Sequence, residues 1–485
     1  MRLPTQELVA EAKGWNRKTG KHAQTGIMNK QSAGGLGSRD TVSTLQTKVA
    51  IVGLGTVGSG VAEILQEQGA RVARHAGRQL RLAKVVVRDL RKPRQYQLPD
   101  ELVTDDLRQI TEDPEIRVVA LLMGGLEPAR TIMLQLLESG KDIVTANKAL
   151  LAEHGPELFD RARALGRSIA FEASVMGGVP IITNISQCLS ANQLLSLSGI
   201  LNGTSNFIVS KMEEQGVPYR AALAEAQELG YAEADPTLDV DGSDAAQKLA
   251  ILAHLAFGAH VDWARIPRVG IDRLETTDLQ WAQDLGYRIR LLAEARLSDD
   301  QQRLDLRVSP TLVRIGTPLA EVRGANNAIN VVGDLVGRVF YQGLGAGRMP
   351  TASAVVADLI DTAVGRTALT FRTLELWSQT KPRVALSERA EAAGRFYLRW
   401  TVDDHPGVLA QIAGALGRHG ISISSVIQRE LPPATPASSD ASTAGVSLVL
   451  MTHEADEKAL QGALAEIERL EAVRAGSVCM RVVDG

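Results

Sequence analysis

The sequence has little cysteine, few aromatic residues and almost no net charge. Its 485 residues include two cysteines, Cys188 and Cys479, which excludes a disulfide scaffold and favours a reducing compartment, the cytoplasm. The 53 basic and 56 acidic side chains leave a formal net charge of −3, so no global positive field exists to attract nucleic acid. The 45% hydrophobic content excludes a chain that is disordered throughout. We expect two to four domains, at roughly 100–200 residues each.

Long hydrophobic runs and metal-binding histidine pairs are also missing. The longest nearly apolar stretch, Leu249–Phe257, contains His254 and is far shorter than the roughly 20 apolar residues of a membrane span. We therefore expect no membrane partner. The 8 histidines are scattered without the spacing of zinc ligands, which disfavours zinc chemistry.

Residues 1–46 differ from the rest of the chain. They contain seven basic and three acidic side chains, many small polar residues and little apolar periodicity. We favour a flexible tail. A start codon placed too early, with Met28 as the other candidate, and an organellar transit peptide stay open. Glu7 and Glu11 argue against the transit peptide, because such peptides are poor in acids.

Strands alternate regularly with helices in residues 47–180. The run Arg117–Met123 is apolar throughout, as in a buried parallel strand. The alternation predicts a Rossmann-type doubly wound α/β domain that binds a nucleotide. The expected strands are 47–53, 81–87, 117–123, 142–145 and 168–173, and the expected helices are 57–68, 128–139 and 156–165.

The remaining chain predicts an α+β domain and a smaller module. Residues 181–340 mix strands, 194–201 and 303–311, with helices, 206–215, 219–229 and 243–257. A glycine-rich segment then leads into a helix at 352–363, and a polar linker spans 381–394. Residues 395–485 have the βαββαβ order of a ferredoxin-like module. Its expected strands are 396–402, 421–428, 446–452 and 472–483, its helices are 407–419 and 454–470, and a long loop lies at 431–445.

Glycine is in excess, with 44 residues, about 9% against a usual share of about 7%. Gly53, Gly55 and Gly58 stand between an expected strand and an expected helix. Their spacing allows a tight turn, close approach of a pyrophosphate and close helix–strand packing, and the helix start at Thr56 and Val57 offers free N–H groups. This context favours a dinucleotide site over an ordinary glycine turn.

Basic residues follow the second expected strand. Arg88 heads a cluster with Arg91, Lys92 and Arg94, which favours the 2′-phosphate of NADP. Asp89 keeps NAD open, because an acid at this strand end binds the ribose hydroxyl of NAD. A solvated basic loop is the third interpretation.

Two lysines and a group of acids are the candidates for chemistry. Lys148 follows the strand 142–145, at the sheet edge where ligands bind, although a solvated surface lysine is an equal alternative. Residues 233–244 hold five carboxylates. Asp244 and Lys248 share one face of a helix that continues apolar nearly all round. Such a lysine can exchange a proton with a carbonyl oxygen, and the other acids suit a substrate ammonium group.

Other interpretations of these residues do not involve catalysis. An i, i+4 ion pair on a solvated surface is common and contributes little. A calcium loop is disfavoured by Pro236 and by the irregular acid spacing. Residues 172–180 end a strand in a glycine turn whose carbonyls suit a hard cation, but a plain turn is favoured from the residues alone.

Taken together, several motifs resemble those of the homoserine dehydrogenase family with a C-terminal ACT domain, from about Thr47 to Gly485. The resemblance implies a reversible NAD(P)H-dependent reduction of L-aspartate 4-semialdehyde to L-homoserine, in threonine, methionine and isoleucine biosynthesis. It also implies that residues 181–340 form a catalytic and dimerisation domain and that 341–380 return to the nucleotide-binding domain. The motifs are Val52–Gly58, Gly140–Lys148, Glu172–Pro180, Leu201–Asn206, Gly230–Lys248 and Gly345–Ala354.

The resemblance assigns roles position by position. Lys248 resembles the catalytic lysine that exchanges the proton on the substrate oxygen, Asp244 would orient it, and Lys148 resembles a second active-site lysine near the nicotinamide. The remaining inferred residues bind substrate (Glu233, Asp239, Gly203, Thr204), complete the cofactor site (Gly345, Gly347) or hold a monovalent cation, sodium, mainly through backbone oxygens (Glu172, Val175, Gly177, Val179). The sequence departs from the family at Met176, usually a small residue, and at Leu121, often Glu.

The turn Asp404–Val408 resembles the first strand-to-helix turn of an ACT domain, with Asp404, Gly407 and Val408 as effector residues. The resemblance implies threonine as effector and a homodimer or homotetramer. A dimerisation module without ligand has nearly equal weight. For the whole chain, the alternatives are a non-catalytic amino-acid sensor on a degenerate dehydrogenase scaffold and a different carbonyl-reducing dehydrogenase. The intact lysine and acid positions argue against both.

Overall fold

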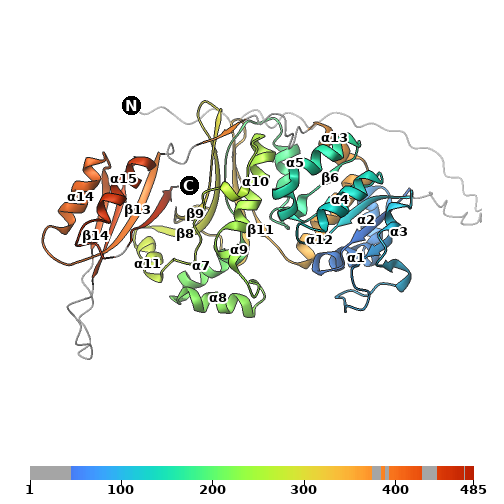
Figure 1. Cartoon of the computed structure of the whole chain (residues 1–485), viewed down its shortest axis with the longest axis horizontal. Helices are drawn as coiled ribbons and strands as arrows, with labels where there is room; N and C mark the ends of the chain where they lie inside the picture. The colour runs from blue at the N-terminus through green and yellow to red at the C-terminus, as the bar shows by residue number, and fades with distance from the viewer. Residues whose placement is uncertain (1–44, 374–383, 388–392, 429–444, 475, 485) are drawn as a thin grey trace, which may run out of the picture. The chain divides into compact units, whose positions relative to one another are not determined.

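The computed structural model describes residues 45–373, 384–387, 393–428, 445–474 and 476–484 (Figure 1). The expected tail at 1–46 and loop at 431–445 lie almost wholly outside these residues, and so does most of the expected linker at 381–394. Within the described ranges, no helix combines the length and apolar character needed to cross a membrane.

The first sheet is parallel and has the strand order β3-β2-β1-β4-β5-β6. This is the order of a dinucleotide-binding doubly wound sheet, so the predicted fold class of this part is confirmed. The strands are β1 (Gln46–Val52), β2 (Gln79–Val86), β3 (Val103–Thr104), β4 (Ile116–Leu121), β5 (Asp142–Thr145) and β6 (Ile169–Ala170).

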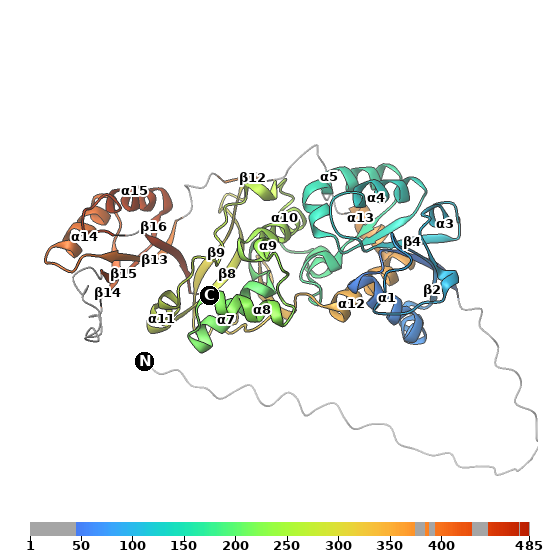
Figure 2. The ribbon, with the colours of Figure 1, turned by 60° about the horizontal axis from the view of Figure 1, so that its bottom comes forward.

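Both faces of this sheet are covered, because alternate residues of its strands are apolar on both sides. In β1, Val49 and Ile51 join one buried cluster, and Ala50 and Val52 join the other. Helices α1 and α12, far apart in sequence, lie side by side over the first face (Figure 2). The helices of this domain are α1 (Thr56–Glu67), α2 (Gly69–Ala76), α3 (Arg108–Thr111), α4 (Ala129–Glu138), α5 (Lys148–Ala164), α12 (Arg348–Ala363) and α13 (Arg366–Thr373).

Three helices begin three or more residues earlier than the sequence predicts. The start expected at Pro156 is wrong: α5 begins at Lys148, because the Asn147 side chain accepts a hydrogen bond from Leu150 N, and the proline is carried inside the helix. Helix α7 (Gly203–Gln215) starts three residues before the expected position, capped in the same way by Asn202. Helix α12 starts at Arg348 instead of 352. Each earlier start places a helix end next to the candidate site.

The second sheet runs β11-β10-β7-β8-β9-β17-β13-β15-β14 and joins the central domain to the C-terminal module. Its strands pair antiparallel, except that β9 and β17 pair parallel through Thr311–Val313 and Arg481–Val483, with the short β12 parallel to the start of β9. The sequence did not predict β8, β10 or β11. The strands are β7 (Leu194–Ile200), β8 (Tyr287–Leu297), β9 (Arg303–Arg314), β10 (Asn326–Gly333), β11 (Gly337–Leu344), β12 (Ala385–Leu386), β13 (Ala393–Val402), β14 (Ile423–Gln428), β15 (Val446–Thr452), β16 (Ala455–Asp456) and β17 (Val478–Val483).

Helix α10 is the buried axis of the central domain. All but two of its residues, Lys248 and Ala256, are buried, as its apolar sequence predicts. In the C-terminal module, α14 and α15 cover one face of the order β17-β13-β15-β14, which confirms the ferredoxin-like prediction (Figure 2). The remaining helices are α6 (Ile181–Thr183), α7, α8 (Tyr219–Glu228), α9 (Thr237–Val240), α10 (Ser243–Phe257), α11 (Thr276–Asp284), α14 (Val408–Arg418) and α15 (Glu457–Ile467).

Candidate active site

One buried carboxylate lies between two lysines. Oδ2 of Asp244 is 2.7 Å from Nζ of Lys248, and its Oδ1 is 3.1 Å from Nζ of Lys148. Asp244 and Lys248 come from the first turns of α10, whereas Lys148 is the first residue of α5. The structure thus brings together three residues that the sequence predicts for catalysis, from two different domains.

The pKa values of this group follow from burial and charge. Burial opposes ionisation of Asp244, but the two ammonium groups and a hydrogen bond from Asn202 outweigh it and lower its pKa to about 2. The charge of Asp244 in turn raises the pKa of Lys148. The Asp244 carboxylate therefore stays ionised through the neutral range.

The lysine of α10 has a second fixed contact. Nζ of Lys248 donates to the carbonyl oxygen of Leu201 at 2.7 Å, and this oxygen also accepts a bond from Nδ2 of Asn327 at 3.0 Å. An ammonium group has three donors. The contacts of Lys248 with the Leu201 carbonyl oxygen and with Asp244 use two of them and leave one for another oxygen. The end of β7 thus orients the lysine toward a remaining partner.

The predicted substrate residues lie around the same point. Asp239 accepts a hydrogen bond from Asn202 at 2.8 Å, and burial raises the pKa of its carboxyl group. Glu233 is exposed, and its charge contributes to the raised pKa of Lys148. The Thr204 hydroxyl donates to the Tyr231 carbonyl oxygen at 2.7 Å, which ties the start of α7 to the acidic segment. These residues form an acidic rim beside the two lysines.

The glycine-rich loop has the geometry of a dinucleotide-binding turn. Gly53 has a φ of +101°, and a Cβ atom on Gly58 would lie 2.1 Å from the Gly53 carbonyl oxygen, so both positions require glycine. A Cβ atom on Gly55 would meet nothing within 4 Å. Because Gly55 precedes the first residue of α1, open space there suits a phosphate group at the helix N-terminus.

Arg88 and Asp89 follow β2 and are exposed. The Asp89 carboxylate accepts a bond from Arg91 N at 2.9 Å, so it caps its own turn. Arg94 donates to the carbonyl oxygens of Asp89 and Leu54 and thereby joins this turn to the glycine-rich loop. A basic edge beside the loop is what an additional phosphate group needs.

Close approach of four segments explains the glycines that follow β11. A Cβ atom on Gly345 would lie 2.1 Å from Cγ of Asn327, and one on Gly177 would lie 2.9 Å from the Gly345 carbonyl oxygen. Gly203 is equally close to the chain at Ala325. Gly347 has a φ of +124° and caps α12. The expected cation turn, the expected substrate loop, the segment that follows β11 and the chain at 325–327 therefore converge.

The expected cation turn is buried, and its carboxylate is already in use. Glu172 accepts hydrogen bonds from Ile182 N and from N and Oγ1 of Thr183, which caps α6. Among the described residues, no backbone N–H donates to the carbonyl oxygen of Val175 or Gly177, so these oxygens fit a hard cation better than the Glu172 carboxylate does. The carbonyl oxygen of Val179, by contrast, accepts a bond from Ile181 N. The described part of the chain has no cluster of three or more His, Cys, Asp or Glu suited to a metal ion.

Two amides were missed by the sequence analysis. Asn202, 4% exposed, donates to the Asp244 carboxylate, and Asn327, 0% exposed, donates to the Leu201 carbonyl oxygen that also contacts Lys248. The helix-capping pattern at Asn202 was the available signal, since asparagine before a helix is a preferred N-cap.

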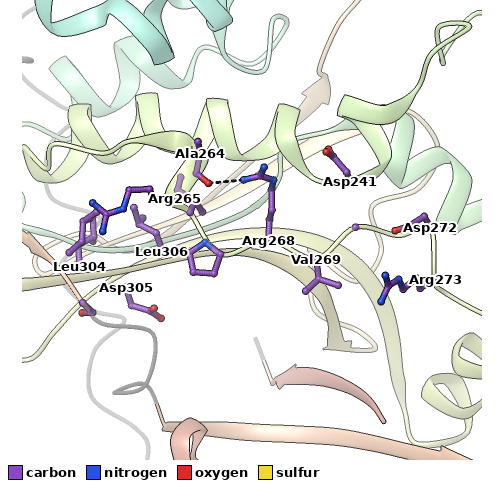
Figure 3. Close-up of a pocket in the computed structure, with 15 residues that line it drawn as sticks. Asp241, Ala264, Arg265, Arg268, Val269, Asp272, Arg273, Leu304, Asp305 and Leu306 are labelled. Carbon is purple, nitrogen blue, oxygen red and sulfur yellow. Dashed lines mark hydrogen bonds between the residues drawn. The ribbon is translucent and has the colours of Figure 1, made fainter. Parts of the chain in front are cut away.

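The expected effector residues lie at the start of α14. Gly407 caps the helix with a φ of +99°, Val408 is its buried first residue, and Oδ1 of Asp404 accepts a bond from Nε2 of Gln428. A cavity with a volume of about 1090 Å³ lies elsewhere (Figure 3). Its lining includes Arg268, which donates to the Ala264 carbonyl oxygen, but none of the predicted catalytic residues.

The combination of a dinucleotide loop and a lysine–carboxylate–lysine cluster defines a nicotinamide-dependent oxidoreductase, here with an added ACT-type module. Three protein-family models match the chain. The family model for homoserine dehydrogenase matches residues 180–360, the one for the homoserine dehydrogenase NAD binding domain matches residues 53–172, and the one for the ACT domain matches residues 397–472.

Relatives agree over nearly the whole chain. The homoserine dehydrogenase of Pseudomonas aeruginosa is 43% identical over 443 residues, 90% of this chain and 98% of that protein. That of Synechocystis sp. is 41% identical over 447 residues, 90% of this chain and 100% of that protein. A crystal structure of a homoserine dehydrogenase from Thiobacillus denitrificans has a TM-score of 0.81 at 40% identity and covers 91% of this chain and 99% of that chain. The chain belongs to the homoserine dehydrogenase family, as its motifs predict.

Proposed function

We propose that this chain catalyses the reversible reduction of L-aspartate 4-semialdehyde to L-homoserine with NAD(P)H. The contact of Asp244 with both Lys148 and Lys248 carries the proposal. A carbonyl reductase must protonate the oxygen that becomes a hydroxyl group, and a lysine with one remaining donor beside a fixed carboxylate can do so. A non-catalytic sensor would have no need for this arrangement and is not favoured.

Each residue of the site has a separate proposed role. Lys248 donates a proton to the substrate's aldehyde oxygen during reduction and takes it back from the hydroxyl group in the reverse direction. Asp244 keeps Lys248 in place, and Lys148 lies on the opposite oxygen of the same carboxylate. Glu233 and Asp239 offer negative charge to the substrate ammonium group. A bound nicotinamide supplies the hydride for the substrate's C4 carbon or takes it up.

Replacing Lys248 by alanine tests the mechanism. We expect Lys248→Ala to lower kcat of semialdehyde-dependent NADPH oxidation by about 10²–10⁴-fold, the usual contribution of a general acid. NADPH affinity should stay unchanged, since Lys248 contacts the substrate-side cluster. Lys211→Ala is the matched control, because Lys211 pairs with Glu225 on α7 and α8. Undiminished turnover of Lys248→Ala would sink the mechanism.

NADP is the proposed cofactor. Arg88 and its basic neighbours support this preference, whereas Asp89, which caps its own turn, is less suited to a ribose hydroxyl. The test compares kcat/KM for NADPH and NADH in wild type and Arg88→Ala. We expect the preference for NADPH to fall about tenfold or more in the variant. A higher wild-type kcat/KM with NADH would show that the role given to Arg88 is wrong.

A sodium ion is the proposed ligand of the turn at 172–179. The carbonyl oxygens of Val175 and Gly177 would hold it, with Glu172 fixing the turn from the side. Met176, buried with a φ of 57°, adopts a conformation that favours glycine and keeps the turn tight. Thermal unfolding in sodium chloride against choline chloride at equal ionic strength tests this. Equal midpoints in the two salts would contradict it.

Threonine is the proposed effector of the ACT domain. The proposed oligomeric state is a homodimer or homotetramer, and the proposed location is the cytoplasm. The turn Asp404–Val408, with its N–H groups at the start of α14, supports binding of an amino-acid carboxylate. Isothermal titration with L-threonine tests it, with Asp404→Ala as the matched variant. Absence of heat at millimolar threonine would favour a module that serves association alone.

A further inference from the structure

A single amide group contacts two acids of the site, the buried Asp244 and the half-buried Asp239. Nδ2 of Asn202 donates to Oδ1 of Asp239 and to Oδ2 of Asp244, both at 2.8 Å. Asn202 is 4% exposed and lies two residues after the end of β7. Its two N–H donors therefore point at two different carboxylates, one expected to bind substrate and one that holds Lys148 and Lys248.

The position of this amide matters because the two acids repel each other. Burial raises the pKa of Asp239, the hydrogen bond from Asn202 lowers it, and the charge of Asp244 adds to the rise. An amide donates two hydrogen bonds without adding charge. It can therefore hold both carboxylates in place without competing with the lysines for them.

The backbone around Asn202 fixes the amide group. Its side-chain oxygen accepts a bond from Ser205 N at 2.7 Å, which caps α7, and the Ser205 hydroxyl donates to the Asp239 carbonyl oxygen at 2.6 Å. The preceding carbonyl, that of Leu201, holds Lys248. One dipeptide at the end of β7 thus contacts the lysine, its carboxylate and the second acid.

We propose that Asn202 is a positioning residue that sets the spacing of Asp239 and Asp244 and so aligns the substrate ammonium site with the proton-transferring lysine. This rests on the proposed function of the site. Asn202 touches neither reacting atom; it acts through the two acids. Its removal should impair both substrate binding and proton transfer while the cofactor site stays intact.

Two substitutions separate positioning from helix capping. Asn202→Asp keeps an equally good N-cap but replaces the two donors by a third carboxylate, and Asn202→Ser keeps a cap oxygen and adds no charge. Asn206→Ser is the matched control: Asn206 is also buried on α7, but it donates to the carbonyl oxygens of Val322 and Gly324, away from the acids.

We expect kcat/KM for aspartate semialdehyde to fall about 100-fold in Asn202→Asp and about 30-fold in Asn202→Ser, with a rise in KM and a fall in kcat. The acid limb of the pH profile should move up by about one unit in Asn202→Asp, because an added carboxylate disfavours ionisation of its neighbours. The dissociation constant of NADPH should stay within twofold. Asn206→Ser should lower thermal stability as much as the two Asn202 variants do, but it should leave the pH profile of kcat/KM unchanged.

A second readout does not need the reaction. The pH dependence of Lys148 acetylation by acetic anhydride, followed by mass spectrometry, reports the pKa that Asp244 raises. We expect this midpoint to shift by half a unit or more in both Asn202 variants and not in Asn206→Ser. Absence of wild-type turnover would count against the proposed function alone. Wild-type kinetics together with a wild-type Lys148 labelling curve in both Asn202 variants would overturn the role of Asn202.

Discussion

Asp244, which we propose orients the proton-transferring lysine, also contributes to stability. Its carboxylate has partners on both oxygens, two lysines and an amide, and it is 6% exposed. Removing such a partner leaves buried charges uncompensated, which is costly. The residue proposed to orient Lys248 is therefore also one that the fold depends on.

The pH dependence of stability should reveal this. A carboxyl group whose folded pKa is lowered from 3.8 to about 2 contributes stability that is complete above pH 4 and is lost as the pH falls through 2. We expect Asp244→Asn to lose about 2 kcal/mol at pH 7, and the difference from wild type to shrink below pH 4. Urea unfolding at pH 7, 5 and 3 measures it. A difference that grows on acidification would contradict the assignment.

At the scale of elements, the glycine-rich loop and α1 make separable demands. Alanine at position 58 would place Cβ 2.1 Å from the Gly53 carbonyl oxygen, whereas alanine at position 55 has open space. We expect Gly58→Ala to destabilise the fold by about 1–3 kcal/mol, as overpacking does. Gly55→Ala should fold normally and lose NADPH affinity about tenfold or more, because its methyl group occupies the approach of the pyrophosphate. Thermal unfolding and fluorescence titration measure both; equal affinities of Gly55→Ala and wild type would place the pyrophosphate elsewhere.

Local sequence patterns predicted those helices and strands whose ends are marked by a residue such as glycine or by the limits of an apolar run. Strand β5 and helix α10 have the expected bounds, since a glycine ends α10 and an apolar run defines both. Strand β8 was missed because its charged residues obscure strand periodicity; Arg290 is fully buried and pairs with Glu213 on α7, a contact that no local pattern reveals.

The site was predicted in its residues but not in its connections. Motifs identified Lys148 and Asp244 as candidates. Only the fold shows that the Asp244 carboxylate, which pairs with Lys248, also contacts Lys148, 96 positions earlier in the sequence (244 minus 148). Asn202 was missed because its role depends on the direction of a side-chain amide, and the sequence contains no record of where Asp239 comes to lie.

At the scale of the whole molecule, the C-terminal module docks on α11 through a buried ion pair. Arg399 on β13 donates to Asp278, which also accepts a bond from the Tyr397 hydroxyl, and the two charged side chains are 8% and 0% exposed. A second carboxylate, Glu275, lies on the solvent side of the same guanidinium. The C-terminal module is therefore held by polar contacts as well as by the shared sheet.

Removal of this arginine should loosen the module. We expect Arg399→Leu to cost about 3–5 kcal/mol, because Asp278 would be left as an unpaired buried charge. Arg418→Leu, whose side chain is 62% exposed beside Glu466, should cost less than about 1 kcal/mol. Urea unfolding gives both values, and limited proteolysis should cut near 393 only in Arg399→Leu. Equal losses in the two variants would show that the pair does not hold the module.

The parallel pairing of β9 with β17 also has a consequence for biosynthesis. Among the described strands, β17 is the last to leave the ribosome, yet it covers the edge of β9, which was translated long before. In that interval the backbone groups of Thr311–Val313 form an open edge, the kind of template on which unfinished chains pair with one another. Nascent chains on one polysome are therefore exposed to mispairing at β9 until β17 has emerged, and chaperones should be needed most during that interval.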